Sequence, residues 1–155
     1  MIKILFVCLG NICRSPMAEF VFKDLVKKQN IEKIFYIQSA ATSKEETGNP
    51  VHPGTKNKLA QFNISTENKT STPLNEKDYN NYDYIIAMET RNITNIYKII
   101  KNDPDKKVSR LLDFTNNPRD IADPWYTHNF DKTYNEVYEG CVALLEYLKK
   151  QHNIS

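Results

Sequence analysis

The 155-residue sequence has few cysteines and histidines and no long hydrophobic run. Its three cysteines, an odd number, do not make the disulfide framework that staples small secreted proteins. Its three histidines, His52, His128 and His152, lack metal-ligand spacing, so we expect no metal site. The apolar runs are too short to cross a bilayer, and the N-terminus has no signal-peptide pattern. We therefore expect a cytoplasmic protein without a membrane span.

A strong excess of charge of one sign is also missing. The chain has 21 Lys and Arg against 19 Asp and Glu, a formal net charge of +2, and its lysines are spread along the sequence. This balance does not indicate a nucleic-acid partner. No repeat or linker divides the chain, and its length is that of one ordinary domain, so we expect residues 1–155 to form a single domain.

Hydrophobic patterning predicts strands that alternate with helices. Residues 2–7 form a nearly continuous apolar run, which is typical of a strand buried on both faces of a parallel sheet. Further strands are predicted over 34–38, 84–88 and 108–112, and helices over 16–28, 55–62, 90–100 and 134–148. This alternation predicts an α/β fold whose parallel sheet has helices on both faces. In such sheets, ligands bind beyond the carboxyl ends of the strands, where the segment after the first strand lies.

That segment, Cys8-Leu9-Gly10-Asn11-Ile12-Cys13-Arg14-Ser15, has the composition of a phosphate-binding loop. Its successive backbone N–H groups, together with the N-terminus of the next helix, can surround an anion. Gly10 and Asn11 tolerate the tight backbone curvature that such a loop requires. The planar guanidinium of Arg14 can bind two phosphate oxygens at once. We therefore predict a phosphate-binding loop between the first strand and the first helix.

Cys8 would lie at the bottom of this electropositive loop, where the reactive thiolate is favoured over the thiol. Ser15 can donate a hydrogen bond to its sulfur. A phenolate leaving group needs a proton donor, and the candidate is Asp123, which Pro124 holds in an extended conformation. Trp125 and Tyr126, which follow, offer aromatic surface for a planar substrate ring. From composition alone, the alternative is that DPWY is simply a turn beside core aromatic residues.

Longer stretches of the sequence resemble the low-molecular-weight protein tyrosine phosphatases. The resemblance rests on VCLGNICRSP at the N-terminus, DPWY before the last helix, SAATS at 39–43, GNP at 48–50 and DYIIAM at 83–88, and it covers essentially the whole chain. It implies a four-stranded parallel sheet flanked by helices. It also implies a two-step reaction through a phosphocysteine, without metal or other cofactor. The expected substrates are phosphotyrosine-containing proteins or peptides, and the expected product is inorganic phosphate.

By motif position, the resemblance implies a role for each site residue. Cys8 is the nucleophile, Arg14 the phosphate clamp, Ser15 the stabiliser of the leaving thiolate and Asp123 the general acid and base. Hydrogen bonds, one of them from Ser39, are expected to hold the loop asparagine, Asn11. Cys13 corresponds to a cysteine that forms a reversible disulfide with the oxidised nucleophile; simple packing of Cys13 is the alternative. The residues expected to contact substrate are Leu9, Gly10, Asn11, Ile12, Cys13, Glu45, Trp125 and Tyr126. A regulatory phosphate on Tyr126 is the alternative to pocket lining.

Two segments depart from the family pattern. Many members have an aromatic pocket wall shortly after the SAATS segment, whereas this chain has Lys44, Glu45 and Glu46. Many members also have a histidine in the segment aligned with residues 68–72, where this chain has Lys69 and Thr70 instead. We therefore expect the loop asparagine to be held differently here.

Three other functions compete with tyrosine phosphatase activity. An arsenate reductase needs a downstream cysteine pair, but only Cys141 remains, on the apolar face of the last helix. An arginine phosphatase tends to have threonine where Ile12 stands, and the bulkier isoleucine favours a flat tyrosine ring. A non-catalytic phosphoprotein-binding module would have no reason to retain both Cys8 and Asp123.

Overall fold

A computed structural model describes all residues, 1–155, and contains one parallel β-sheet. The strands are β1 (Ile2–Cys8), β2 (Phe35–Ala41), β3 (Tyr84–Ala87) and β4 (Val108–Arg110). Their order in the sheet is β2-β1-β3-β4, and every neighbouring pair is parallel. The predicted α/β fold with a four-stranded parallel sheet is therefore confirmed.

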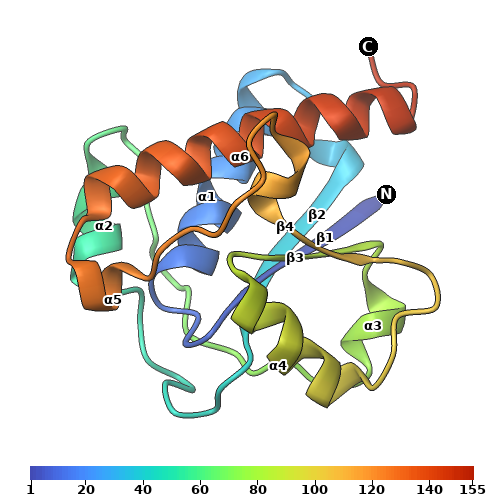
Figure 1. Ribbon diagram of the computed structural model, residues 1–155. Coiled ribbons are helices and arrows are strands. Elements are labelled where there is room, and N and C mark those ends of the chain that lie inside the picture. The colour runs from blue at the N-terminus through green and yellow to red at the C-terminus, as the bar shows by residue number, and fades with distance from the viewer.

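Helices cover both faces of the sheet (Figure 1). One face carries α1 (Arg14–Lys28), α2 (Pro53–Ala60) and α6 (Phe130–Gln151). The other carries α3 (Asp78–Asn81) and α4 (Thr90–Ile100). The remaining helical segments are the single turn α5 (Pro124–Thr127) and two 3₁₀-helices, Glu32–Ile34 and Leu111–Phe114.

The central strand β1 explains this layering. Its side chains alternate between two hydrophobic clusters: Ile4 and Phe6 belong to the larger one, under α1 and α6, while Leu5 and Val7 belong to the smaller one, under α4. Because successive strand residues point to opposite faces, an apolar run can fill both clusters at once. The sheet is thus buried on both sides, and its carboxyl edge remains for a site.

Several element boundaries differ from the sequence prediction. Helix α1 begins at Arg14 rather than Pro16, because the first turn of a helix has free N–H groups and tolerates a proline. Strand β4 ends at Arg110, and a 3₁₀ turn takes the place of its predicted last residues. Helix α6 begins at Phe130, four residues before the predicted start, where the Asn129 side chain accepts a hydrogen bond from the Lys132 N–H.

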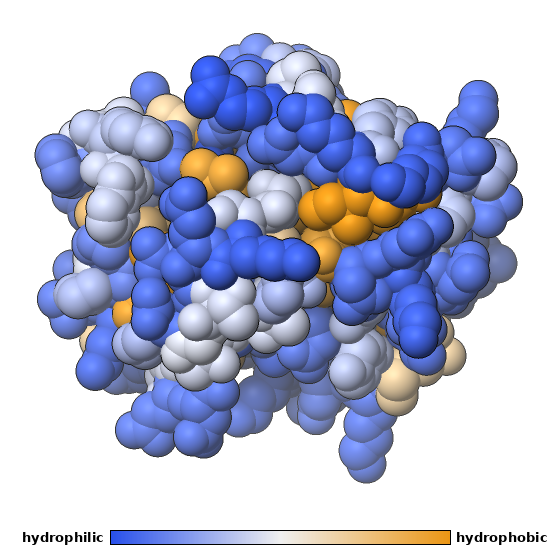
Figure 2. Space-filling model, turned by 90° about the horizontal axis from the view of Figure 1, so that it is seen from below, coloured by the Kyte–Doolittle hydropathy of each residue, from blue (hydrophilic) through white to orange (hydrophobic).

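The surface seen from below in Figure 1 is largely hydrophilic, and its hydrophobic atoms form small separate areas (Figure 2). None of the helices has the length and apolar character needed to span a membrane.

Candidate active site

The segment between β1 and α1 forms a tight loop that neighbouring segments hold from outside. The carbonyl groups of Cys8 and Leu9 accept hydrogen bonds from the N–H groups of Thr42 and Ser43 (3.0 and 2.9 Å). The Gly10 carbonyl accepts a bond of 2.8 Å from the Ser71 hydroxyl. Because these carbonyl oxygens are engaged outside the loop, its curvature is fixed before any ligand binds.

Inside the loop, hydrogen-bond donors surround the Cys8 sulfur. The Cys8 side chain is the last of β1 and is buried. Its Sγ accepts the N–H groups of Asn11 and Ser15 at 3.3 and 3.4 Å, and it lies 3.1 Å from the Ser15 hydroxyl. Two N–H donors and the Ser15 hydroxyl thus surround the sulfur, where they can stabilise the negative charge of a thiolate.

Asn11 shapes the loop from behind. Its backbone is in the left-handed region, with φ 55°, which asparagine adopts more readily than most residues. Its amide group donates hydrogen bonds to the hydroxyls of Ser15 (2.7 Å) and Ser39 (2.9 Å). Its Oδ1 accepts the Thr72 N–H at 3.1 Å. Two expectations need correction: Asn11 donates to Ser39 rather than accepting from it, and its buried side chain is not part of the pocket lining.

Arg14 lies almost completely buried beside Cys8. It forms an ion pair with Glu89, lies 3.3 Å from Asp123 Oδ2 and donates a 2.8 Å hydrogen bond to the Ile121 carbonyl. Burial lowers the pKa of Arg14, but the negative charges of Cys8, Asp123 and Glu89 outweigh it and raise the pKa overall. The guanidinium is therefore a fixed cation. Its Nε is buried and has no hydrogen-bond partner in the protein.

Asp123, from a segment distant in sequence, lies next to Arg14 in the same pocket. It caps α5, and its Oδ1 accepts the Trp125 N–H at 3.0 Å while Oδ2 faces Arg14. The segment before it is tied to the sheet, because the Ile121 N–H donates to the Met88 carbonyl at the end of β3. The carboxyl group is thus held near the sulfur by a segment distant in sequence.

These groups line a cavity of about 140 Å³. Sequence analysis named ten of its twelve lining residues, and the structure adds Ser43 and Glu46: Cys8, Leu9, Gly10, Ile12, Cys13, Arg14, Ser43, Glu45, Glu46, Asp123, Trp125 and Tyr126. Ser15, Asn11 and Ser39 are not among the lining residues; their side chains bond to one another on the side of the loop away from the cavity.

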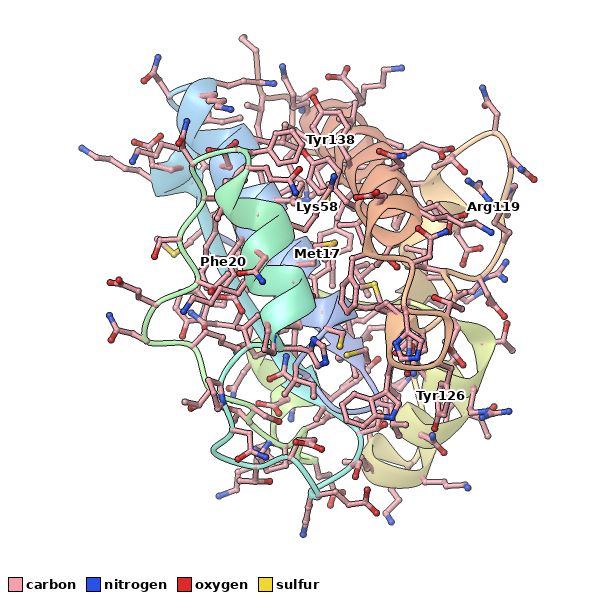
Figure 3. All side chains as sticks on the ribbon, turned by 90° about the vertical axis from the view of Figure 1, so that its left-hand side faces the viewer. Met17, Phe20, Lys58, Arg119, Tyr126 and Tyr138 are labelled. Atoms are coloured by element: carbon pink, nitrogen blue, oxygen red, sulfur yellow. The ribbon has the colours of Figure 1, made fainter.

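The outer wall of the cavity is aromatic and exposed. Trp125 is half exposed and forms a T-shaped pair with His52, which stacks on Phe130. Tyr126 is 71% exposed. Figure 3 shows Tyr126 at the end of the molecule where α6 begins, remote from Tyr138 further along that helix. The two acidic side chains Glu45 and Glu46 border the same opening.

Two parts of this region were not found from the sequence. Glu89 follows β3, and its place at the carboxyl edge of the sheet was the only available signal. Glu19 is buried on α1, next to Ser39, Lys23 and Lys69. The spacing of Ser15, Glu19 and Lys23 at four-residue intervals puts them on one helix face and could have indicated this cluster.

The cysteines and the possible metal ligands complete the inventory. All three cysteines are free thiols; Cys13 lines the pocket, and Cys141 is buried in the core, as predicted. Burial, assisted by the nearby charges of Cys8, Asp123 and Glu46, raises the pKa of Cys13 to about 12. No group of three or more His, Cys, Asp or Glu side chains is arranged to hold a metal ion.

Comparison with known proteins identifies this arrangement. The family described as low molecular weight phosphotyrosine protein phosphatase matches residues 3–154. The chain belongs to this family. By family it is a protein tyrosine phosphatase, a phosphoric monoester hydrolase, which confirms the resemblance found in the sequence.

Several relatives match this phosphatase over nearly their whole length. Low molecular weight protein-tyrosine-phosphatase YfkJ of Bacillus subtilis is 38% identical over 156 residues, which cover 99% of this chain and 100% of YfkJ. The YfkJ crystal structure superposes with a TM-score of 0.94 over 97% of this chain and 96% of that one. SP-PTP of Streptococcus pyogenes is 40% identical, with a TM-score of 0.85 over 96% and 93% of the two chains. A Drosophila arginine phosphatase, 29% identical, has a TM-score of 0.85 over 96% and 98%.

Proposed function

We propose that this phosphatase hydrolyses phosphotyrosine in proteins or peptides through a phosphocysteine formed on Cys8. The observation that carries the proposal is the position of the Cys8 sulfur in the cavity lining, with two N–H donors and the Ser15 hydroxyl around it and Arg14 and Asp123 in the same lining. A buried sulfur favours a long phosphorylated side chain such as phosphotyrosine over a short one such as phosphoserine.

In the first step, the Cys8 thiolate attacks phosphorus and the bond from phosphorus to the tyrosine oxygen breaks. Arg14 and the loop N–H groups bind the non-bridging oxygens, whose charge is spread out in the transition state. Asp123 in its acid form gives its proton to the departing phenolate oxygen. The dephosphorylated tyrosine then leaves, and Asp123 remains as a carboxylate.

In the second step, Asp123 takes a proton from water as the water oxygen attacks phosphorus. The bond from phosphorus to sulfur breaks, and inorganic phosphate is released. Cys8 leaves as a thiolate, which the Ser15 hydroxyl at 3.1 Å stabilises. No metal ion or other cofactor takes part in either step.

Arg14 and Asp123 form an ion pair in the pocket lining. A phosphate dianion that enters beside Arg14 competes with the Asp123 carboxylate for the guanidinium, and the buried Nε offers one more donor. Binding of substrate would therefore free the Asp123 carboxyl group to face the leaving oxygen. The same competition links phosphate binding to the position of the general acid.

We also propose that Cys13 protects the nucleophile from oxidation. Peroxide converts the Cys8 thiolate to a sulfenic acid, and the Cys13 sulfur then displaces hydroxide to form a disulfide, which thiols can reduce. The three free thiols suit a reducing compartment, and on that ground we propose a cytoplasmic location.

Phosphate release from matched phosphotyrosine and phosphoarginine peptides tests the proposal, with Cys8→Ser as the control. We expect turnover of the phosphotyrosine peptide, preferred because Ile12 narrows the pocket, and complete loss of turnover in Cys8→Ser. Turnover that survives in Cys8→Ser would refute the phosphocysteine mechanism. A preference for phosphoarginine would keep the mechanism and overturn the substrate.

A further inference from the structure

A buried carboxylate lies behind the phosphate-binding loop, on the side opposite the pocket. Glu19 of α1 is only 2% exposed. Its Oε2 lies 2.5 Å from Lys23 Nζ, and its Oε1 lies 3.3 Å from the nearly buried Lys69 Nζ. Lys69 also donates a 2.8 Å hydrogen bond to the Ser39 carbonyl. None of these charged groups touches the pocket in which the reaction takes place, so the reaction steps leave them unexplained.

Hydrogen bonds connect this carboxylate to the loop, and their direction is determined. The Ser39 hydroxyl donates to Glu19 Oε1 at 2.5 Å. The oxygen of that hydroxyl accepts the Asn11 amide at 2.9 Å. Asn11 cannot be turned around, because its Oδ1 accepts the Thr72 N–H. The amide group must therefore donate to both serines, Ser39 and Ser15.

The same reasoning extends to the nucleophile. The Ser15 oxygen accepts the Asn11 amide at 2.7 Å, so its single proton is free to bond elsewhere. The two acceptors within reach are the Cys8 sulfur at 3.1 Å and the Ala40 carbonyl at 3.5 Å. The nearer is the sulfur, and an anionic sulfur is the stronger acceptor. The chain of bonds thus ends with a hydroxyl proton pointing at Cys8.

This direction requires that Glu19 be ionised. A proton on Glu19 Oε1 would point at Ser39, whose own proton would then face the Asn11 amide, which cannot accept it. A proton on Oε2 would face the Lys23 ammonium, which also has no acceptor. An isolated buried carboxylate takes up a proton, whereas nearby cations keep it charged. Lys69 and Lys23 supply those cations from two different segments.

We propose that Lys69 is a positioning residue for the nucleophile: with Lys23 it keeps Glu19 ionised and so orients Ser39, Asn11 and Ser15 as donors toward the Cys8 thiolate. The proposal rests on the proposed role of Cys8. It also accounts for the lysine that stands in the segment where many family members have a histidine.

The electrostatics around Glu19 agree with this assignment. Burial, with the charge of Lys23, lowers the pKa of Lys69 overall. The charge of Glu19, the hydrogen bond to it and the charge of Cys8 act in the opposite direction and favour the ammonium form. Burial, together with Tyr36, Asp78 and Glu19, raises the pKa of Tyr82, so this side chain stays a neutral phenol and adds no charge. The cations that face Glu19 are therefore the two lysines.

Replacing Lys69 by methionine removes the cation and keeps an unbranched side chain. The test has two readouts. The first is the rate at which iodoacetamide alkylates Cys8 as a function of pH, quantified on the Cys8 peptide by mass spectrometry. The second is kcat/KM for a phosphate ester with a good leaving group. In Lys69→Met, both the alkylation rate at mildly acidic pH and kcat/KM should fall about 10-fold. The pH midpoint of alkylation should move upward by about one unit.

Two further variants separate charge from general damage. Lys56→Met removes an exposed lysine of α2 and should change both rates less than about twofold, as is usual for surface changes. Lys69→Arg keeps the positive charge and should stay within about threefold of wild type. An unshifted alkylation midpoint in a folded Lys69→Met protein would overturn the proposal. So would an equal loss in Lys69→Arg, because the charge would then not matter.

Thermal unfolding shows which variants are folded. If Lys69→Met does not fold, Lys23→Met decides, since Lys23 is the more exposed cation of the cluster; it should move the midpoint in the same direction, and no movement overturns the proposal. Alkylation needs no turnover. A wild-type protein that fails to hydrolyse phosphotyrosine would therefore refute the proposed function, while the effect of Lys69 on Cys8 would still be measured.

Discussion

The Cys13 thiol should be almost inert toward alkylation in the folded protein, although it lines the pocket. Burial, the largest cause, and nearby negative charge raise its pKa to about 12. At pH ~7.5, only about one Cys13 in 30,000 would then be a thiolate, compared with roughly one in ten for an ordinary thiol. Because the thiolate is the reactive form, Cys13 should react about 3,000-fold more slowly than glutathione.

The measurement uses a variant with Cys8→Ser and Cys141→Ala, in which Cys13 is the only cysteine. This variant loses the charge of Cys8 but keeps burial, the largest cause of the raised pKa, so it tests the effect of burial. Its alkylation rate by iodoacetamide should rise about tenfold for each pH unit between roughly pH 7 and pH 10. The same protein in denaturant, where burial is lost, should react like a free thiol. A folded-state rate within about tenfold of glutathione would refute the reasoning, because burial would then not suppress the thiolate of Cys13.

The proposed redox role inherits this pH dependence. The Cys13 thiolate must attack the oxidised Cys8 sulfur, so closure of the disulfide after peroxide treatment should also speed up about tenfold per pH unit. Oxidation converts the Cys8 thiolate to a neutral sulfenic acid and so removes one of the charges that hold the Cys13 proton. A closure rate independent of pH would contradict this order of events.

Three further outcomes are expected. Asp123→Asn should lower kcat about 100-fold for phosphotyrosine but less than about 10-fold for an ester with a good leaving group, since only phosphotyrosine needs the proton; equal losses in steady-state kinetics would remove Asp123 from the acid role. Gly140→Ala should destabilise the protein by about 1–2 kcal/mol in urea unfolding, because its new Cβ would lie 2.5 Å from Leu111 Cγ and overpacking outweighs the gain in helix propensity; a more stable variant would contradict this. Burial raises the pKa of Cys141 in the folded state, so above pH ~9 the unfolded state loses the Cys141 proton first. The free energy of unfolding should therefore fall by about 1.4 kcal/mol per pH unit as the pH rises. Cys141→Ala should flatten that slope in unfolding experiments at alkaline pH.

Much of the fold follows from local sequence. The apolar run of β1 requires burial on both faces, and the structure divides its side chains between two clusters. The apolar periodicity of α4 and α6 predicted both helices. The short helices α3 and α5 were not predicted, because each has only four residues and a single turn shows no hydrophobic periodicity. The start of α6 was predicted four residues too late, because the Asn129 cap determines it and not the apolar repeat.

The chemistry of the loop could also be predicted from the sequence. Its side chains, Cys8, Asn11, Arg14 and Ser15, lie in one short segment, residues 8–15, so few backbone angles determine how close they come to one another. Asp123 was already a candidate proton donor from its own segment; the family resemblance assigned it the acid and base role and added Ser39. Only the tertiary structure decided what stands behind the loop. Glu89 and Lys69 come from other segments, and periodicity shows that a residue faces the interior without showing what it meets there.

The sequence by itself therefore determined the layered sheet, the loop after the first strand and the sulfur, guanidinium and carboxyl groups of the reaction. The tertiary structure decided the direction of the hydrogen bonds that end at Cys8 and the pairing of Glu89 with Arg14. It also decided the burial that raises the pKa of Cys13. The physical reason is that residue types carry chemical capacity, whereas protonation and hydrogen-bond direction depend on neighbours that only folding brings within a few ångströms.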